Sequence, residues 1–185
     1  SMKELIENNK RREGPVINFS NHERLNEHIN FDKIGANKIN DYFWRSEIRP
    51  IQFKKSQKGT VQEKYLNKAI SLLELFRSKK LSVNEVFDLD QFAKLMAIRA
   101  VFGSTEFDVD DMKFYYNPVS NLLEPISKEI HSEADRFVSG FNPWVFKSDN
   151  LRYPWQKAFL YLLYNDQIFY EKYLFELNNY SNKKF

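Results

Sequence analysis

Acidic side chains gather in one short stretch of the 185-residue sequence, where their oxygens could serve chemistry. The stretch holds Glu106, Asp108, Asp110 and Asp111, and a further carboxylate, Glu129, follows later in the chain. Carboxylate oxygens are the ligands that magnesium prefers, so the pattern is compatible with a magnesium site. Acidic loops are nevertheless more often simply solvated, and Glu129 by itself is typical of a surface residue. Both interpretations stay open at this point.

Composition argues against several other kinds of reactive site. The chain has no cysteine, which removes disulfides, a thiol nucleophile and the usual structural zinc sites. Its three histidines, His22, His28 and His131, are too scattered for a histidine-rich metal cluster, although His131 lies two residues after Glu129. Only 5 glycines occur, so a glycine-rich phosphate-binding loop is not expected.

Helical periodicity and capping signals predict the elements that would position the acidic stretch. A helix is expected over residues 60–80, and a capping box over residues 82–85 opens one short turn of helix. Asp88 and Gln91 form a further capping pair, and the helix that they open is expected to end at Gly103, just before the acidic residues. The side chains expected to be buried on this helix are Phe92, Leu95, Met96, Ile98 and Phe102.

Two β-favouring runs predict a hairpin after the acidic stretch. Residues 113–116 and 122–126 flank a turn-rich connection at 117–121, which is typical of a β-hairpin. Short strands are also expected at residues 16–19 and near 48–53.

Two helices dense in large apolar and aromatic side chains are expected at the C-terminal end. They cover Trp155 to Tyr164 and Gln167 to Leu177, with Asn165-Asp166 as the break between them. The sequence therefore predicts one α+β domain over residues 1–185 that is mainly α-helical. The aromatic-rich part from Trp144 to Tyr180 would leave apolar surface exposed unless it is covered, which favours an interaction module as one interpretation.

Net charge and hydropathy bear on whether the chain binds nucleic acid or spans a membrane. The net charge is +3, from 28 basic and 25 acidic residues that are interspersed, so the charges are typical of solvated faces and no nucleic-acid partner is expected. No apolar run approaches the roughly 18 residues needed to span a bilayer. Ser1-Met2 resembles a cloning scar, so we expect that the natural N-terminus has been removed and that export cannot be judged from it.

Several segments, in order along the chain, resemble the CotH family of spore-coat and surface-associated atypical protein kinases. Residues 87–94 (FDLDQFAK) are similar to the family's acidic capped helix, and residues 111–118 (DMKFYYNP) are similar to the start of its hairpin. Residues 123–126 (LEPI) are similar to the closing strand. The stretch at 7–15 and the helical tail at 169–177 agree as well.

The resemblance implies roles for three carboxylates. In kinases a catalytic Asp and a metal-binding Asn stand five residues apart on one loop, and a second metal-binding Asp follows a hairpin. By position, Glu106 would stand in for the catalytic Asp, Asp111 for the metal-binding Asn and Glu129 for the metal-binding Asp. All three depart from the family's residue types, which implies a degenerate kinase.

The same resemblance implies a kinase C-lobe with one inserted hairpin at about residues 111–127, whose nucleotide-binding N-lobe is missing from this chain. Magnesium and ATP would be cofactors of the full-length protein, no cofactor is expected for this chain alone, and the chain alone should be inactive. The substrate would be a Ser/Thr-containing coat or surface protein, and the location secreted or at the cell surface. The alternative is a non-catalytic helical interaction module of a bacterial surface or adhesion protein.

Overall fold

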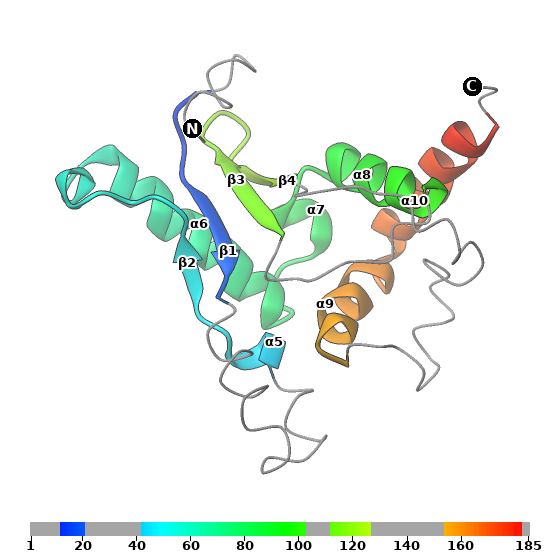
Figure 1. The fold of residues 1–185 in the computed structure, drawn as a ribbon, viewed down its shortest axis with the longest axis horizontal. Helices are drawn as coiled ribbons and strands as arrows, with labels where there is room; N and C mark the ends of the chain where they lie inside the picture. The colour runs from blue at the N-terminus through cyan, green and yellow to red at the C-terminus, as the bar shows by residue number, and fades with distance from the viewer. Residues whose placement is uncertain (1–11, 21–41, 103–111, 127–153, 183–185) are drawn as a thin grey trace, which may run out of the picture.

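The computed structural model describes residues 12–20, 42–102, 112–126 and 154–182 (Figure 1). About 56% of these residues are helical and a small antiparallel sheet accompanies them, so the expected mixed, mainly helical fold is confirmed. The strands are β1 (Val16–Phe19), β2 (Ile48–Pro50), β3 (Lys113–Asn117) and β4 (Leu122–Ile126). The helices are α5 (Tyr42–Arg45), the 3-10 turn η1 (Lys55–Gln57), α6 (Val61–Arg77), α7 (Val83–Val86), α8 (Leu89–Val101), α9 (Pro154–Tyr164) and α10 (Gln167–Ser181).

The four strands form one antiparallel sheet in the order β2-β1-β3-β4. The predicted hairpin is confirmed as β3 and β4, with Lys113 opposite Ile126 at its open end. Asn121 lies in its turn with a φ of 61°, a left-handed conformation that asparagine tolerates. The hairpin is not an isolated insertion among helices, because β1 pairs with the other edge of β3. The expected short strands at 16–19 and near 48–53 thus complete the same sheet as β1 and β2.

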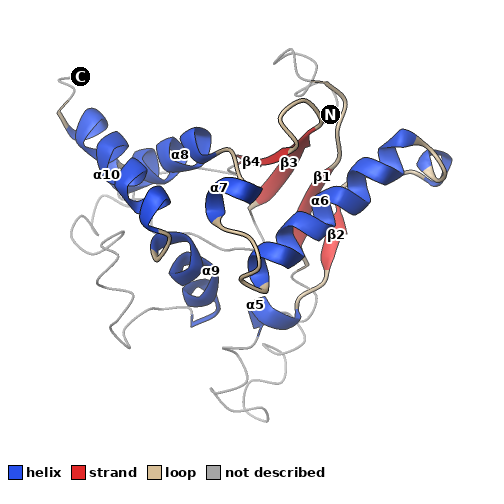
Figure 2. Ribbon diagram, turned by 180° about the vertical axis from the view of Figure 1, so that it is seen from behind, coloured by secondary structure: helices blue, strands red, loops and turns tan. Residues whose placement is uncertain are grey.

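One face of the sheet packs on α6, because alternate strand residues point to that side. Ile17 and Phe19 of β1 are buried there, as are Phe114 and Tyr116 of β3. Figure 2 shows α6 crossing this face of the sheet. The tyrosine rings of Tyr65 on α6 and Tyr116 lie 5.7 Å apart between centroids, so the helix is held to the strands through aromatic contact.

Aromatic side chains from the sheet, from four helices and from the connection between α7 and α8 meet in one core. Phe159 of α9 lies at its centre, with ring centroids 5.7 to 6.4 Å from six other phenylalanine rings. Those rings belong to Phe19, Phe43, Phe76, Phe87, Phe92 and Phe114, and all seven side chains are essentially inaccessible to solvent. Most pairs are tilted or edge-to-face, the arrangements that aromatic quadrupoles favour.

The caps predicted at the starts of α7 and α8 are present, and the start of α10 has a cap that was not predicted. Glu85 accepts hydrogen bonds from the backbone N–H of Ser82 at 2.9 Å and from its hydroxyl, at the start of α7. Asp88 accepts from the backbone N–H of Gln91 at 3.0 Å, at the start of α8. Asp166, expected only to break the chain between two helices, is the N-cap of α10 and accepts from the N–H of Phe169 at 3.0 Å.

The buried face of α8 is narrower than expected, because Leu95 and Ile98, which were expected to be buried, are only partly buried. Phe92 and Met96 are buried as predicted, but Phe102 is 47% exposed, so its expected burial is wrong. The helical period explains the difference, because Phe102 lies on the half-buried face of Leu95 and not on the face of Phe92. The side chain that extends the buried face at the end of the helix is Arg99. Gly103, the expected helix end, lies outside the described residues.

The C-terminal helices pack as an arm against α8. Both views show α10 alongside α8, and Lys172 of α10 forms an ion pair with Asp90 of α8 at 2.8 Å. Asp166, between α9 and α10, also accepts a hydrogen bond from the backbone N–H of Val83 at 3.1 Å, which joins the arm to α7. Among the described helices, none has the length and apolar character needed to cross a bilayer.

Candidate functional site

The three carboxylates predicted for the kinase-like site lie outside the described residues. Glu106 and Asp111 fall in the segment 103–111, and Glu129 falls in the segment 127–153. Asp108, Asp110 and His131 fall in the same two segments. The convergence of these side chains on one site therefore stays a prediction.

The described residues fix where both segments attach. Residues 103–111 join the end of α8 to Met112, whose side chain is buried directly before β3. Residues 127–153 follow Ile126 at the end of β4. Because Lys113 and Ile126 are paired across the hairpin, the segment with Asp111 and the segment with Glu129 attach to the same open end of it.

The hairpin and α8 are held rigidly to one another. The backbone N–H of Asp88 donates to the carbonyl of Leu123 on β4 at 2.9 Å, and Phe87 forms a parallel bridge with the same residue. The Phe87 ring also contacts those of Phe92 and Phe114 at 5.1 and 5.4 Å between centroids. The start of α8 and the strands are thus one unit, from which the acidic segments depart.

Asp88 and Asp90 both serve this frame, Asp88 as a helix cap and Asp90 through its ion pair with Lys172. Both carboxylate oxygens of Asp88 accept hydrogen bonds from Gln91, at 3.0 Å from the backbone and 2.7 Å from the side chain. The hydrogen bond from Lys172 lowers the pKa of Asp90 below its usual value. Within the ranges that the structure describes, no group of three or more His, Cys, Asp or Glu side chains is placed to hold a metal ion.

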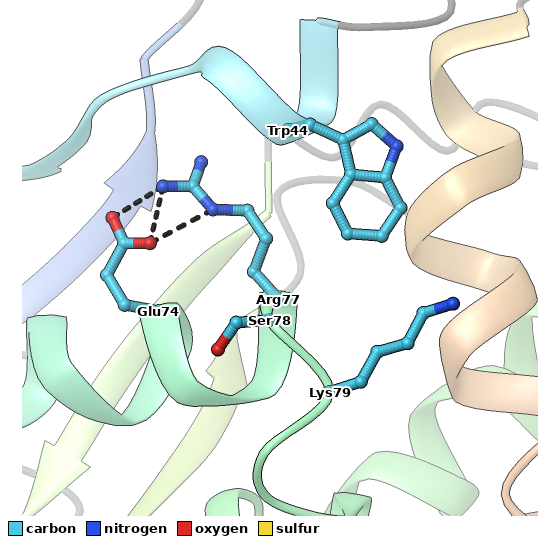
Figure 3. A pocket seen from close by; sticks show the side chains of 5 residues that line it. All are labelled: Trp44, Glu74, Arg77, Ser78 and Lys79. Atoms are coloured by element: carbon cyan, nitrogen blue, oxygen red, sulfur yellow. Dashed lines mark hydrogen bonds and ion pairs between the residues drawn. The ribbon is translucent and has the colours of Figure 1, made fainter.

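A pocket of about 350 Å³ opens between α5 and the end of α6 (Figure 3). Its lining side chains are Trp44, Glu74, Arg77, Ser78 and Lys79. No sequence signal pointed to it, because Trp44 stands in a stretch without clear periodicity and Lys79 follows the last periodic residue of a helix. Only the packing of α5 on α6 brings the two together.

Arg77 forms the fixed wall of this pocket. Its Nη1 donates to the carbonyls of Phe43 and Ser46, at 3.1 and 2.6 Å. Its Nε donates to Glu74 at 3.1 Å, and its Nη2 donates to both carboxylate oxygens of Glu74. All three nitrogens of the guanidinium thus donate within the protein. Arg77 therefore holds the connection between α5 and β2 against α6.

Lys79 forms the opposite wall with Trp44. Its ammonium lies 5.9 Å from the centroid of the indole ring, within cation–π range. Lys79 has a φ of 59°, and it occupies the C′ position of a Schellman motif at the end of α6. The motif's two hydrogen bonds run from Lys79 N–H to the carbonyl of Phe76 at 2.9 Å and from Lys80 N–H to that of Leu75 at 2.8 Å.

Buried polar side chains also meet where α8, α9 and α10 pack. Arg99, Tyr164, Tyr173 and Glu176 are all at most 8% exposed, and the rings of Tyr164 and Tyr173 are 5.1 Å apart between centroids. Burial raises the pKa of Tyr164 well above its usual value, and the neighbouring Tyr173 adds to the effect. Burial also raises the pKa of Tyr173 to about 12. Both phenols therefore stay protonated at physiological pH.

Comparison of the chain with models of protein families, with curated protein sequences and with solved structures finds no significant match.

Proposed function

We propose that the chain forms the helical lobe of a CotH-like atypical protein kinase domain, in which Asp111 and Glu129 bind the magnesium of Mg–ATP and Glu106 occupies the catalytic position. The observation that carries the proposal is the frame around these residues. A capped helix, α8, leads into the acidic segment, and the hairpin that follows receives both acidic segments at its open end, with Lys113 opposite Ile126. This is the order of elements that the resemblance implies.

The chemistry of the three side chains favours binding over efficient catalysis. Magnesium takes oxygen ligands in near-octahedral geometry, and all three candidates are carboxylates, so the donor set fits the ion. A glutamate, however, places its oxygens one methylene further from the backbone than an aspartate does. A displacement of about 1 Å can lower the rate of a catalysed reaction roughly 100-fold. The protein is accordingly proposed to be a pseudokinase or a weak Ser/Thr kinase.

The proposal includes a nucleotide-binding lobe of the same protein as the structural partner, and a coat or surface protein as the substrate or binding partner. A kinase needs a lysine on the nucleotide phosphates and a covering loop. The strands β1 to β4 form one sheet that packs on α6, and the proposal places the nucleotide-binding lobe in another part of the same protein.

Calorimetric titration of Mg–ATP into the protein in its full natural length tests the proposal. We expect saturable binding, and we expect Asp111→Ala to abolish it because the variant removes a metal ligand. Glu171→Ala is the matched control, since Glu171 is an exposed carboxylate of α10 that accepts a hydrogen bond from the side chain of Gln167 at 2.9 Å. The 185-residue chain alone should transfer no phosphate to Ser or Thr. Full-length protein that shows no heat of binding, or an Asp111→Ala variant that binds as the parent does, would contradict the kinase-like function.

A second function, a non-catalytic interaction module, is favoured by one specific observation. Four large apolar side chains on α9 and α10 are 43% to 58% exposed, namely Tyr161, Ile168, Leu174 and Phe175. Exposed apolar side chains mark surfaces that bind other proteins where they form a contiguous patch, and the interaction-module function requires that these four do so. The titration separates the two functions, because a module needs neither magnesium nor ATP.

A further inference from the structure

One wall of the pocket between α5 and α6 is formed by Arg77, and Glu74 balances its charge. All three guanidinium nitrogens of Arg77 donate to Glu74 or to the carbonyls of Phe43 and Ser46, so the cation is already engaged within the protein. The Arg77 side chain is only 12% exposed, whereas that of Glu74 is 46% exposed. A ligand entering the pocket would therefore meet the edge of a neutral ion pair on this side, with a partly accessible carboxylate.

The other wall offers an aromatic face and a cation. Trp44 is 41% exposed although it is a tryptophan, the kind of side chain that usually loses most of its surface on folding. Figure 3 shows its ring and the Lys79 side chain on the same side of the pocket, opposite Glu74 and Arg77. Within the described part of the chain, the Lys79 ammonium forms no hydrogen bond or ion pair. It makes a cation–π contact with the Trp44 indole.

Lys79 is held in this position at a conformational cost. The C′ position of a Schellman motif is usually glycine, because a side chain disfavours the left-handed conformation. Strained residues of this kind persist where the surrounding structure fixes them, and they are concentrated at ligand-binding sites. Here the strained backbone directs a free ammonium over an exposed indole, at the edge of a concave surface.

We infer that this pocket binds a small organic monoanion with a flat, ring-shaped body, such as an aromatic carboxylate. The ring would stack on Trp44 and the anionic group would pair with Lys79. The accessible carboxylate of Glu74 disfavours a second negative charge on the ligand. Pockets for small molecules range from about 300 to 1,000 Å³, so a volume of about 350 Å³ suits one or two fused rings better than a nucleotide. The residues that line this pocket include none of those proposed to bind Mg–ATP.

Nuclear magnetic resonance of the indole N–H groups tests this inference on the 185-residue chain. The chain has three tryptophans, and Trp44→Phe identifies the signal of Trp44. The probe is 2-naphthoate, and 2-naphthamide is its neutral counterpart of the same shape. We expect a saturable shift of the Trp44 signal with a Kd on the order of 1 mM, the affinity that a ligand of this size attains at a modest free energy per atom. The amide should bind about fivefold more weakly because it lacks the charge.

Variants of the two neighbouring lysines assign the charge. Lys79→Asn should weaken naphthoate binding about fivefold, because it removes the cation, and asparagine still tolerates the left-handed conformation. Lys80→Asn is the matched control and should bind as the parent chain does, since Lys80 does not line the pocket. The inference is overturned if the Trp44 signal does not saturate, if the amide binds equally well, or if Lys79→Asn binds as tightly as Lys80→Asn.

Discussion

At the residue scale, a few side chains at helix ends join the elements of this protein. Asp88 and Asp166 each accept a backbone N–H of their own helix, and Asp166 accepts a second one from Val83 of another helix. Arg77 does the same with donors, because its guanidinium binds two carbonyls of the chain between α5 and β2. Hydrogen bonds to charged groups contribute more to stability than those between neutral groups, so these few side chains at helix ends are important for joining the elements.

Lys79 gives a prediction at this scale. Lys79→Gly should raise the free energy of unfolding by about 0.5–1 kcal/mol, because glycine adopts the left-handed conformation of the C′ position without steric cost. Denaturation with urea, followed by far-ultraviolet circular dichroism, measures the change. Lys80→Gly is the control, since the backbone there does not have a positive φ, and it should leave stability unchanged or lower it. Equal effects of the two variants would show that Lys79 is not strained.

Some contacts of individual side chains could be predicted from the sequence, and others could not. The pairs Ser82 with Glu85 and Asp88 with Gln91 were predicted, because capping depends on residues three apart and their chemistry is local. The contact of Trp44 with Lys79 was not predicted, because it depends on how α5 packs on α6. The carboxylates Glu106, Asp111 and Glu129 lie outside the described residues, so their placement stays a prediction.

At the scale of elements, strand pairing within a hairpin could be predicted from the sequence, whereas pairing between strands far apart in the chain could not. The hairpin of β3 and β4 was predicted because its strands flank a short turn, which is visible in the sequence. The pairing of β1 with β3 was not, although β1 was expected as an extended stretch, because strand propensity does not specify a partner far away in the chain. The buried face of α8 was misjudged at Phe102 for a related reason, since apolar character alone does not fix which face is covered.

Asp166 gives a prediction for the elements. Asp166→Ala should lower the free energy of unfolding by about 2 kcal/mol, because it removes the cap of α10 and leaves the Val83 N–H of α7 without its acceptor. Asp166→Asn should cost less, since its amide oxygen can still cap the helix. Asn165→Ala is the neighbouring control, because Asn165 is exposed and its side chain donates only to the carbonyl of Tyr161 at 2.7 Å. A loss in Asp166→Ala no larger than that in Asn165→Ala would contradict the role of Asp166 as the joint between α10 and α7.

At the scale of the whole molecule, the aromatic core makes the sheet and the helices one cooperative unit. Phe159 contacts rings from β1, β3, α5, α6 and α8, together with Phe87, so it links elements that are far apart in sequence. A frame of this kind is what both proposed sites require. The Mg–ATP proposal needs α8 and the hairpin to stay fixed relative to one another, and the pocket needs α5 to stay against α6.

Phe159→Ala tests this cooperativity. Truncation of a fully buried phenylalanine costs about 3–5 kcal/mol, a large part of the 5–15 kcal/mol that stabilises a typical domain. If the core is shared, circular dichroism of the helices and the Trp44 indole signal should be lost together in urea, at a lower midpoint than in the parent chain. Tyr161→Ala on the same helix is the control, since its side chain is 58% exposed and the change should stay within about 0.5 kcal/mol. Separate transitions for the two probes in Phe159→Ala would mean that the α5–α6 pocket unfolds independently of the helical arm, and the two proposed sites would then not share one frame.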